Sequence, residues 1–161
     1  MKHILEAGRH LLNLINEVLD IARIDWGRFT LSTEEISVKE IMQEALDLIQ
    51  PIAIEREIRL QSISAELNDW YILANRQCIR QVLLNLLSNA VKYNRERGLV
   101  ELSCEEVPEK ILRIKVSDTG SGIPLEKMKR LFNPFDRLGA EQSSIEGTGL
   151  GLALCKQLVG Q

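Results

Sequence analysis

The segment Gln81–Asn94 constrains the fold more than any other stretch of the sequence. Its apolar residues recur every three or four positions, which predicts a helix with one face against a core. Asn85, Asn89 and Lys92 share this spacing, so two amides and an ammonium lie along one stripe. Tyr93 lies beside them. Asparagine is a mediocre helix former because its side chain competes for backbone hydrogen bonds. A solvated polar face would explain one asparagine, but the whole set favours a binding site facing the helix.

Composition narrows the class of protein. The chain has 161 residues, of which 45% are hydrophobic, enough for one ordinary domain with a core. Lys and Arg total 20 against 23 for Asp and Glu, and no basic block stands out, so nucleic acid is not expected as a partner. The apolar runs are too short to span a bilayer and no signal peptide is evident, which predicts a cytoplasmic location. The three cysteines lack metal-ligand spacing and are interpreted as free thiols.

Residues 2–25 have the pattern of a long amphipathic helix. The apolar positions alternate steps of four and three, as in a coiled-coil seam, and a second apolar track widens the stripe. So wide a stripe predicts packing in a helical bundle, on another helix or on a second copy of the chain. An ordinary helix folded onto the main domain is the alternative. We therefore assign 1–27 to a separate helical element and 28–36 to a linker strand.

The next segment predicts a helix followed by two strands. Ser37 with Glu40 three residues later has the form of a capping box, and the helical period continues beyond it. Pro51 is expected to bend or interrupt this helix. Alternation or β-rich composition over 58–63 and 70–74 predicts two strands before the Gln81–Asn94 helix.

The second half of the chain predicts a hairpin. Asn75 is a suitable N-cap for the asparagine-rich helix. Beyond that helix, Leu99–Val107 and Ile111–Ser117 both alternate, with a short polar turn between them. The predicted order is therefore helix, strand, strand, helix, strand, strand.

Two glycine-rich stretches follow the hairpin. Asp118 is predicted at a strand end, followed by a tight turn through Gly120 and Gly122, so its carboxylate is an exposed and positioned acceptor. Pro124 should then begin a short helix reaching Leu131. A polar, aperiodic segment over 139–146 is expected to be a mobile loop. The glycine run after it opens a final helix, and backbone N–H groups at such a start are suited to bind phosphate.

Taken singly, these motifs are weak. The run from Gly147 reads GxGxGx, which argues against a dinucleotide-binding turn, and no GxxxxGK[ST] loop occurs. Asp118-Thr119-Gly120 also resembles the catalytic strand end of an aspartic protease. In such a protease the asparagine-rich helix would have no role, and the chain after Ile123 would continue as a strand.

Together the motifs closely resemble the catalytic, ATP-binding domain of sensor histidine kinases, in the GHKL or Bergerat-fold superfamily. Four boxes characteristic of that family occur in order: the N box Asn85–Asn94, the G1 box Asp118–Pro124, the F box Phe132–Leu138 and the G2 box Gly147–Leu152. The resemblance implies an α+β fold, a two-layer α/β sandwich with a mixed sheet packed on helices, over residues 37–161. It also implies that 1–27 is the second helix of a dimerisation and histidine-phosphotransfer hairpin.

The resemblance assigns ATP and Mg²⁺ as cofactors and gives the N-box and G1-box residues roles. Asp118 would accept a hydrogen bond from the adenine amino group. Asn89 would bind Mg²⁺ through its amide oxygen, which is a hard ligand suited to that ion. Asn85 would support the metal site. Lys92 would approach the phosphates, and Tyr93 would pack by the adenosine.

The remaining site residues implied by the resemblance lie in the glycine turns and the F box. Gly120 and Gly122 would let the backbone pass close to the base, while Arg137 would compensate γ-phosphate charge during transfer. The residues expected to wrap the phosphates are Gly147, Thr148, Gly149, Leu150 and Gly151.

Asn85 separates branches of the superfamily. ATP-hydrolysing members such as gyrase carry a water-activating Glu at this position, and an amide cannot act as a general base. The resemblance thus implies transfer of phosphate to a protein histidine, with a response regulator as later partner. A non-catalytic signalling module of the same fold, or a superfamily ATPase, are the alternatives.

The sequence departs from the family pattern at the phosphoacceptor. The family's acceptor histidine is followed by an acidic residue, whereas His3 is followed by Ile4 and His10 by Leu11. We therefore expect a fragment, truncated at its C-terminus, that binds nucleotide without phosphorylating itself. The apolar stripe of its first helix predicts a homodimer.

Overall fold

The computed structural model describes residues 32–63, 70–139 and 147–160, which fall into two compact units. The first unit spans Ser32–Ile123, and the second includes the described residues from Pro124 onward. The helix predicted over 2–25 lies outside the described residues, as do residues 140–146 of the loop predicted over 139–146.

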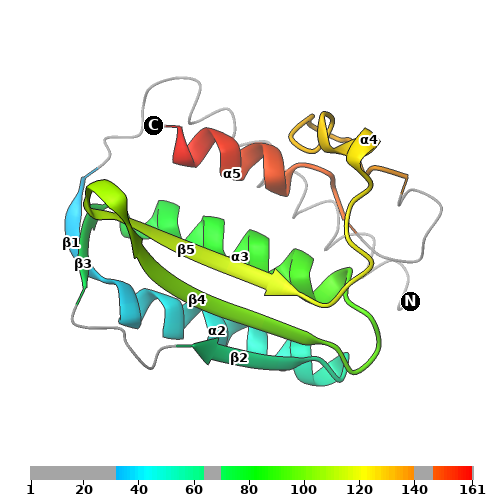
Figure 1. Ribbon diagram of the computed structural model, residues 1–161, viewed down its shortest axis with the longest axis horizontal. Helices are drawn as coiled ribbons and strands as arrows, with labels where there is room; N and C mark the ends of the chain where they lie inside the picture. The colour runs from blue at the N-terminus through cyan, green and yellow to red at the C-terminus, as the bar shows by residue number, and fades with distance from the viewer. Residues whose placement is uncertain (1–31, 64–69, 140–146, 161) are drawn as a thin grey trace, which may run out of the picture. The chain divides into compact units, whose positions relative to one another are not determined.

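The main sheet of the first unit has the strand order β2-β4-β5 (Figure 1). Strand β2 (Arg59–Ile63) runs parallel to β4 (Leu99–Val107), and β4 runs antiparallel to β5 (Ile111–Asp118). The short 3₁₀ turn η1 (Pro108–Lys110) joins β4 to β5, so the predicted hairpin is confirmed. The sheet is mixed, as the α+β prediction requires.

A two-stranded ribbon forms beside this sheet. Strand β1 (Glu34–Ser37) pairs antiparallel with β3 (Tyr71–Ala74), with Ser37 opposite Tyr71. The N–H of Val38 then donates to the carbonyl of Trp70 at 3.0 Å, which closes the ribbon at the start of the next helix. A strand was expected over 28–36. The strand that the structure describes there is β1, which begins at Glu34, ends at Ser37 and belongs to the first compact unit.

Both predicted helix caps are confirmed. Helix α2 (Val38–Glu55) begins after Ser37, whose Oγ accepts from the N–H three residues on at 3.4 Å. Helix α3 (Arg76–Lys92) begins after Asn75, whose Oδ1 accepts from the N–H three residues on at 2.9 Å. Each cap satisfies one backbone donor that the first helical turn leaves without a partner.

Pro51 was predicted to bend or interrupt α2, and the interruption is wrong. The helix continues through Pro51 to Glu55. Proline removes one backbone hydrogen bond and disfavours a helix interior by about 3 kcal/mol. Ile49 and Ala53, on either side of it, are both buried in the core, and burying an apolar side chain of Ile size contributes about 1.5–3 kcal/mol. Tertiary packing of the apolar face thus holds the helix together across the proline.

The asparagine-rich helix ends two residues earlier than predicted. Lys92 is its last residue, and Tyr93 is the C-cap, with its N–H donating to the carbonyl of Asn89 at 3.0 Å. Asn94 leaves the helix because its side chain makes other bonds, including one from Nδ2 to the carbonyl of Leu99 at 3.1 Å. This local competition is typical of asparagine and turns the chain toward β4.

The core of the first unit lies between the sheet and the two helices, which pack side by side on one face of it (Figure 1). Alternate residues of β4 point into it, including Val100 and Leu102, both fully buried. Leu112, Ile114 and Val116 of β5 pack against the same core. The residues that the two helices bury there are Val38, Ile41, Met42, Ala45, Leu46, Ile49, Ala53, Leu83, Leu87, Ala90 and Val91. This is the predicted layered arrangement of a mixed sheet on helices.

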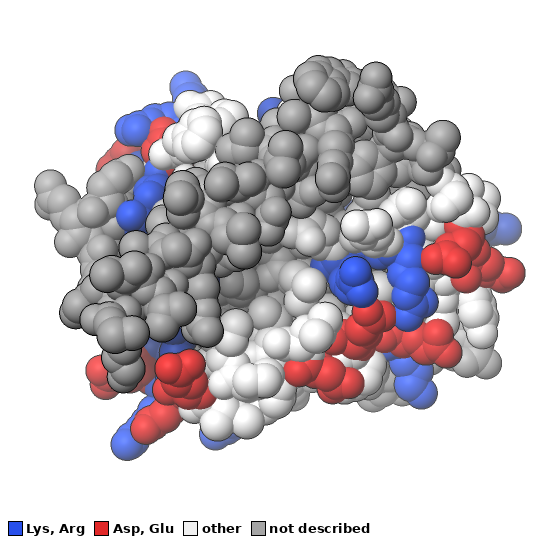
Figure 2. Space-filling view, turned by 180° about the vertical axis from the view of Figure 1, so that it is seen from behind, with Lys and Arg blue, Asp and Glu red and all other residues white. Residues whose placement is uncertain are grey.

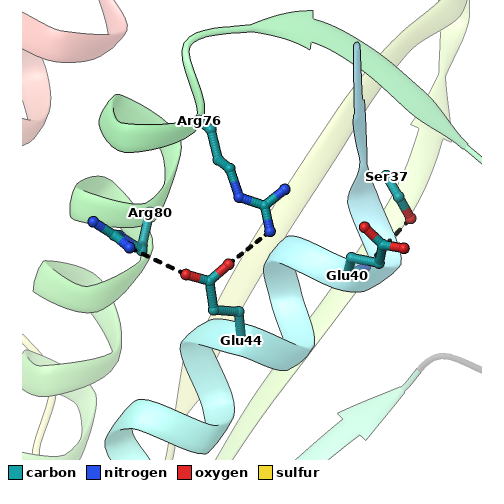
Figure 3. A network of polar contacts seen from close by, with 5 residues as sticks. All are labelled: Ser37, Glu40, Glu44, Arg76 and Arg80. Carbon is teal, nitrogen blue, oxygen red and sulfur yellow. Dashed lines mark hydrogen bonds and ion pairs between the residues drawn. The ribbon is translucent and has the colours of Figure 1, made fainter. Parts of the chain in front are cut away.

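Glu44 joins the two helices by ion pairs (Figure 3). From α2 its carboxylate reaches Arg76 Nη2 at 2.8 Å and Arg80 Nη1 at 3.2 Å, both on α3. The hydrogen bonds from these two guanidinium groups lower the pKa of Glu44 below its ordinary value of 4.5. Figure 2 shows cationic and anionic side chains interspersed on the described parts of the face seen from behind.

We expect Glu44→Gln to destabilise the protein at neutral pH. Because the folded-state pKa of Glu44 is lowered, its contribution is present above the unfolded value and is lost as pH falls through the folded value. The urea midpoints of wild type and variant should therefore differ at pH 7 and converge as pH falls below 4.5. Glu57→Gln is the matched control, because the Glu57–Arg97 pair at 3.2 Å is highly exposed. An E44Q effect that persists unchanged in acid would contradict this assignment.

The second unit carries two described helices. Helix α4 (Leu125–Met128) follows Pro124 as predicted but is shorter, since the chain continues in turns rather than as a helix to Leu131. Helix α5 (Gly151–Val159) follows the glycine run, as expected, and buries Ala153, Leu154 and Cys155. Among the residues that the structure describes, no helix is both long and apolar enough to cross a membrane.

Candidate functional site

The polar stripe predicted on the asparagine-rich helix is present on α3. By helical periodicity Asn85, Asn89 and Lys92 lie on the side of α3 away from its buried face, which carries Leu83 and Leu87. All three polar residues are nonetheless half-buried. The stripe therefore offers two amides and a cation in a partly desolvated setting, where hydrogen bonds and charges act more strongly than in open water.

Asp118 ends strand β5 in the position that the sequence predicts. It is paired in register with Val100 and its side chain is exposed. Its Oδ1 accepts a hydrogen bond from the N–H of Gly120 at 2.7 Å, which folds the carboxylate over the turn. Because a carboxylate has two oxygens with several acceptor sites, Asp118 can still accept from a ligand.

Gly120 brings the glycine turn against the end of α3. A Cβ at Gly120 would lie 2.5 Å from the carbonyl oxygen of Tyr93 and 2.7 Å from Oδ1 of Asp118, so only glycine fits there. Tyr93 itself is exposed. The structure thus joins the two parts of the predicted site that lie in the first unit, namely the end of the polar stripe and the Asp118 turn. Gly122 follows with a φ of +71° and open space around it.

Thr119 and Asn94 form a polar junction that the sequence does not predict. The Thr119 hydroxyl accepts from the N–H of Leu99 and donates to Oδ1 of Asn94, each at 2.9 Å. Both side chains are half-buried. A threonine after the strand-end aspartate and an asparagine at a helix end were visible signals, but nothing in their spacing indicates that they meet.

In the second unit the F box and the glycine run meet through their backbones. Phe135 donates its N–H to the carbonyl of Gly149 at 3.0 Å. A Cβ at Gly149 would lie 2.7 Å from the backbone carbon of Phe135, and its φ of +76° also favours glycine. The two predicted motifs are therefore in direct contact, which sequence separation alone does not indicate.

The glycine run leads into the start of α5. Gly147, Thr148, Gly149 and Gly151 are half-buried, whereas the side chain of Leu150 is buried and only 1% exposed. Thr148 Oγ1 accepts from the N–H of Leu150 at 3.2 Å. The run therefore presents its backbone, while Leu150 anchors it by its side chain.

The remainder of the F box is tied to the chain around α4. Asp136 bonds Arg130 Nε at 2.7 Å and the N–H of Leu138 at 2.9 Å. The Leu138 N–H lowers the pKa of Asp136 most, and Arg130 lowers it further. Lys127 Nζ donates to the Leu138 carbonyl at 2.6 Å. These bonds flank Arg137, the residue predicted to act on the γ-phosphate, which is half-buried.

The amide oxygens of α3 could hold a magnesium ion only if phosphate oxygens of a bound nucleotide supply further ligands. Among the described residues no group of three or more His, Cys, Asp or Glu side chains could hold a metal ion. Mg²⁺ in nucleotide sites is held by one or two protein oxygens together with substrate phosphates and waters. The amide oxygen of Asn89, with Asn85 one turn away, fits that arrangement.

Comparison with known proteins identifies the family. Residues 74–161 match the model of the histidine kinase-, DNA gyrase B-, and HSP90-like ATPases. The chain is 38% identical over 162 residues to the circadian input-output histidine kinase CikA of Synechococcus elongatus, covering 99% of this chain and 21% of CikA. The chain belongs to this ATPase family, as a catalytic domain of the sensor histidine kinase type.

Solved structures agree with this assignment. The full-length ShkA structure in complex with AMPPNP superposes with a TM-score of 0.81 at 33% identity, covering 96% of this chain and 32% of ShkA. Histidine kinase ThkA, solved in complex with the response regulator protein TrrA, superposes with a TM-score of 0.67 at 25% identity. That match covers 83% of this chain and 38% of ThkA. The chain thus spans well under half the length of these relatives.

Proposed function

We propose that this chain binds Mg-ATP and transfers its γ-phosphoryl group to a histidine of a phosphotransfer domain. The observation that carries the proposal is the close approach of Gly120 to the carbonyl of Tyr93. Through it the carboxylate of Asp118 lies at the same end of the first unit as the last turn of α3, which carries Asn89 and Lys92. A hydrogen-bond acceptor for a nucleotide base, Asp118, therefore lies at the same end as Asn89 and Lys92, which suit a phosphate chain.

In this proposal the first unit recognises the nucleoside and part of the phosphate chain. Asp118 accepts from the adenine amino group, and Tyr93 packs beside the adenosine. Gly120 and Gly122 allow the backbone to pass near the base. Lys92 neutralises phosphate charge, for which a half-buried ammonium is suited.

Asn89 would hold Mg²⁺ with Asn85 in support. The bound ion would neutralise charge on the phosphate oxygens during transfer. The amide of Asn89 contributes a neutral oxygen, so the phosphates themselves supply the negative ligands.

The residues of the second unit would bind the phosphates through their backbone. Gly147, Thr148, Gly149 and Gly151 precede or begin the nine-residue helix α5, whose first N–H groups favour an anion. Leu150 would contribute its backbone only, because its side chain is buried. Arg137 would stabilise the charge that develops on the γ-phosphoryl oxygens.

The nature of residue 85 supports phosphoryl transfer over hydrolysis. In the transfer step a ring nitrogen of the acceptor histidine forms a bond to the γ-phosphorus, the bond from phosphorus to the ADP oxygen breaks, and ADP leaves. This step needs positioned phosphates and no activated water. Asn85 carries an amide, which cannot take a proton from water as a carboxylate would.

Related kinases indicate the partners proposed for the whole protein. CikA is a histidine kinase by name, and ThkA was solved with a response regulator protein. We propose that this chain acts within a dimeric kinase of the same type, that its phosphohistidine serves a response regulator, and that it works in the cytoplasm.

The proposed binding is tested by isothermal calorimetry with ADP, with and without Mg²⁺. We expect wild type to bind ADP, and to bind it more tightly with Mg²⁺, since the amide oxygen of Asn89 would hold the ion and the ion would offset phosphate charge. Inosine diphosphate, which lacks the adenine amino group, is the matched ligand control and should bind more weakly. Absence of ADP binding by a folded wild-type chain would overturn the proposed function.

The transferase step is tested separately with γ-labelled ATP and an added phosphotransfer domain from a related kinase. An acid-labile label on the added domain is the expected result. Steady release of free phosphate, without transfer, would instead show an ATPase.

A further inference from the structure

We infer that Thr119 is a positioning residue for adenine recognition, acting through the polar junction that it forms with Asn94 and Leu99. The inference rests on the proposed function, since it concerns how Asp118 is held at the end of its strand. Thr119 itself does not need to touch the nucleotide.

The backbone and side chain of Thr119 are held by the same residue of β4. Its N–H donates to the carbonyl of Leu99 at 3.2 Å, and its hydroxyl accepts from the N–H of Leu99 at 2.9 Å. The pairing of β4 with β5 ends at Val100 opposite Asp118. Thr119 therefore holds the chain to β4 one residue beyond the end of β5. Without these bonds the end of this edge strand, which carries Asp118, would be free to fray.

Asn94 closes the junction from the α3 side. Its Oδ1 accepts from the Thr119 hydroxyl at 2.9 Å and from the N–H of Arg95 at 3.0 Å, while its Nδ2 donates to the Leu99 carbonyl at 3.1 Å. One side chain thus binds both the strand β4 and the residue next to Asp118. The end of α3 and the end of β5 are held in one geometry.

Gly98 provides the space for these two side chains. It is buried, and a Cβ there would overlap the Asn94 side chain and lie 2.8 Å from the Thr119 hydroxyl oxygen. The junction is therefore closely packed on the side of Gly98. Its polar atoms have little freedom to find other partners if one of them is removed.

The hydroxyl group carries the effect, because it both accepts and donates. Valine has nearly the same shape as threonine but can do neither, so Thr119→Val would leave the Leu99 N–H without this acceptor and the Asn94 Oδ1 without this donor in a half-buried place. Serine retains both bonds. Thr119→Ser and Thr119→Val thus separate the hydroxyl from the methyl group.

Loss of the Thr119 hydroxyl would affect the adenine site through the two residues next to Thr119 in the chain. Asp118 precedes it, and Gly120, which lies against the Tyr93 carbonyl and donates to Asp118 Oδ1, follows it. A shift of Thr119 moves the carboxylate relative to α3. The directional hydrogen bond to the adenine amino group would weaken before any other interaction with the nucleotide, because hydrogen bonds weaken steeply with misalignment.

The experiment compares wild type, T119V, T119S and the control S117A by competition binding of ADP and inosine diphosphate, with thermal unfolding of each variant. Ser117 is exposed on β5, one residue before Asp118. We expect T119V to weaken ADP binding by about three- to tenfold and inosine diphosphate binding by less, so that the preference for adenine narrows. T119S and S117A should match wild type.

The Asn94→Ala variant tests whether Asn94 and Thr119 affect nucleotide affinity jointly. If the two side chains act as one unit, the double variant N94A/T119V should lose no more affinity than the more affected of the two single variants. Equal weakening of both nucleotides by T119V, with a lower melting temperature, would show a merely structural role and overturn the inference. Unchanged binding by T119V would also overturn it, while the proposed function would stand. A wild type that binds no ADP would overturn both.

Discussion

Replacing Asp118 by asparagine is expected to lower the affinity for ADP by about 10- to 100-fold. The interaction removed is a hydrogen bond from the adenine amino group to a charged carboxylate, and bonds of this kind contribute about 1.5–3 kcal/mol. Asparagine keeps an oxygen that can accept from the N–H of Gly120, so the turn itself is preserved. Its amide N–H₂ group, however, would face a ligand donor. Calorimetric titration with ADP and Mg²⁺ measures the change.

Two controls show whether the Asp118→Asn variant loses only its interaction with the adenine base. The affinity for inosine diphosphate should not fall, because this nucleotide has a carbonyl acceptor in place of the amino group and the asparagine N–H₂ group can donate to it. The melting temperature should also stay close to that of wild type, since Asp118 is exposed at the end of an edge strand. An unchanged ADP affinity in D118N would remove Asp118 from the adenine site.

The largest loss of stability is expected from Gly120→Ala. The added Cβ would lie 2.5 Å from the carbonyl oxygen of Tyr93 and 2.7 Å from Oδ1 of Asp118, and the first of these is backbone that cannot rotate away. Forcing an extra carbon into a packed region costs about 1–3 kcal/mol. The free energy of unfolding in urea should fall by this amount, and ADP affinity should fall with it, because the turn must move away from α3.

Gly122→Ala separates this steric effect from the cost of backbone conformation. Gly122 has a φ of +71° but no atom within 4 Å of a Cβ placed there. Alanine at this position should cost only the strain of a left-handed conformation, about 1 kcal/mol. A Gly120→Ala variant as stable as wild type would mean that Tyr93 and Gly120 do not touch in solution.

Local chemistry was sufficient to predict most elements of the fold. Ser37 and Asn75 identify helix starts because their side chains satisfy backbone donors a few residues away. The β4–β5 hairpin follows from alternation on both sides of a short turn. Each of these signals acts within a short stretch of chain, where the sequence itself contains both partners.

Interactions between residues far apart in the sequence determined the features of the helices and strands that were predicted wrongly or not at all. Pro51 is compatible with a continuous helix because Ile49 and Ala53 are buried in the core. The asparagine-rich helix stops at Lys92 because Asn94 finds acceptors and donors on β4 and just beyond β5. Pairing of β1 with β3, and of β2 parallel to β4, likewise depends on surfaces brought together only by folding.

The sequence by itself determined the family and the order of elements, and it indicated the residues proposed for the site, because the four boxes and the helix caps are local patterns of residue type. It placed Asp118 at a strand end and Asn89 and Lys92 on one helix face. Only the tertiary structure decided that Gly120 touches the Tyr93 carbonyl and that Thr119 bonds to Asn94. Such interactions depend on distances across the fold, and nothing in residue spacing specifies them.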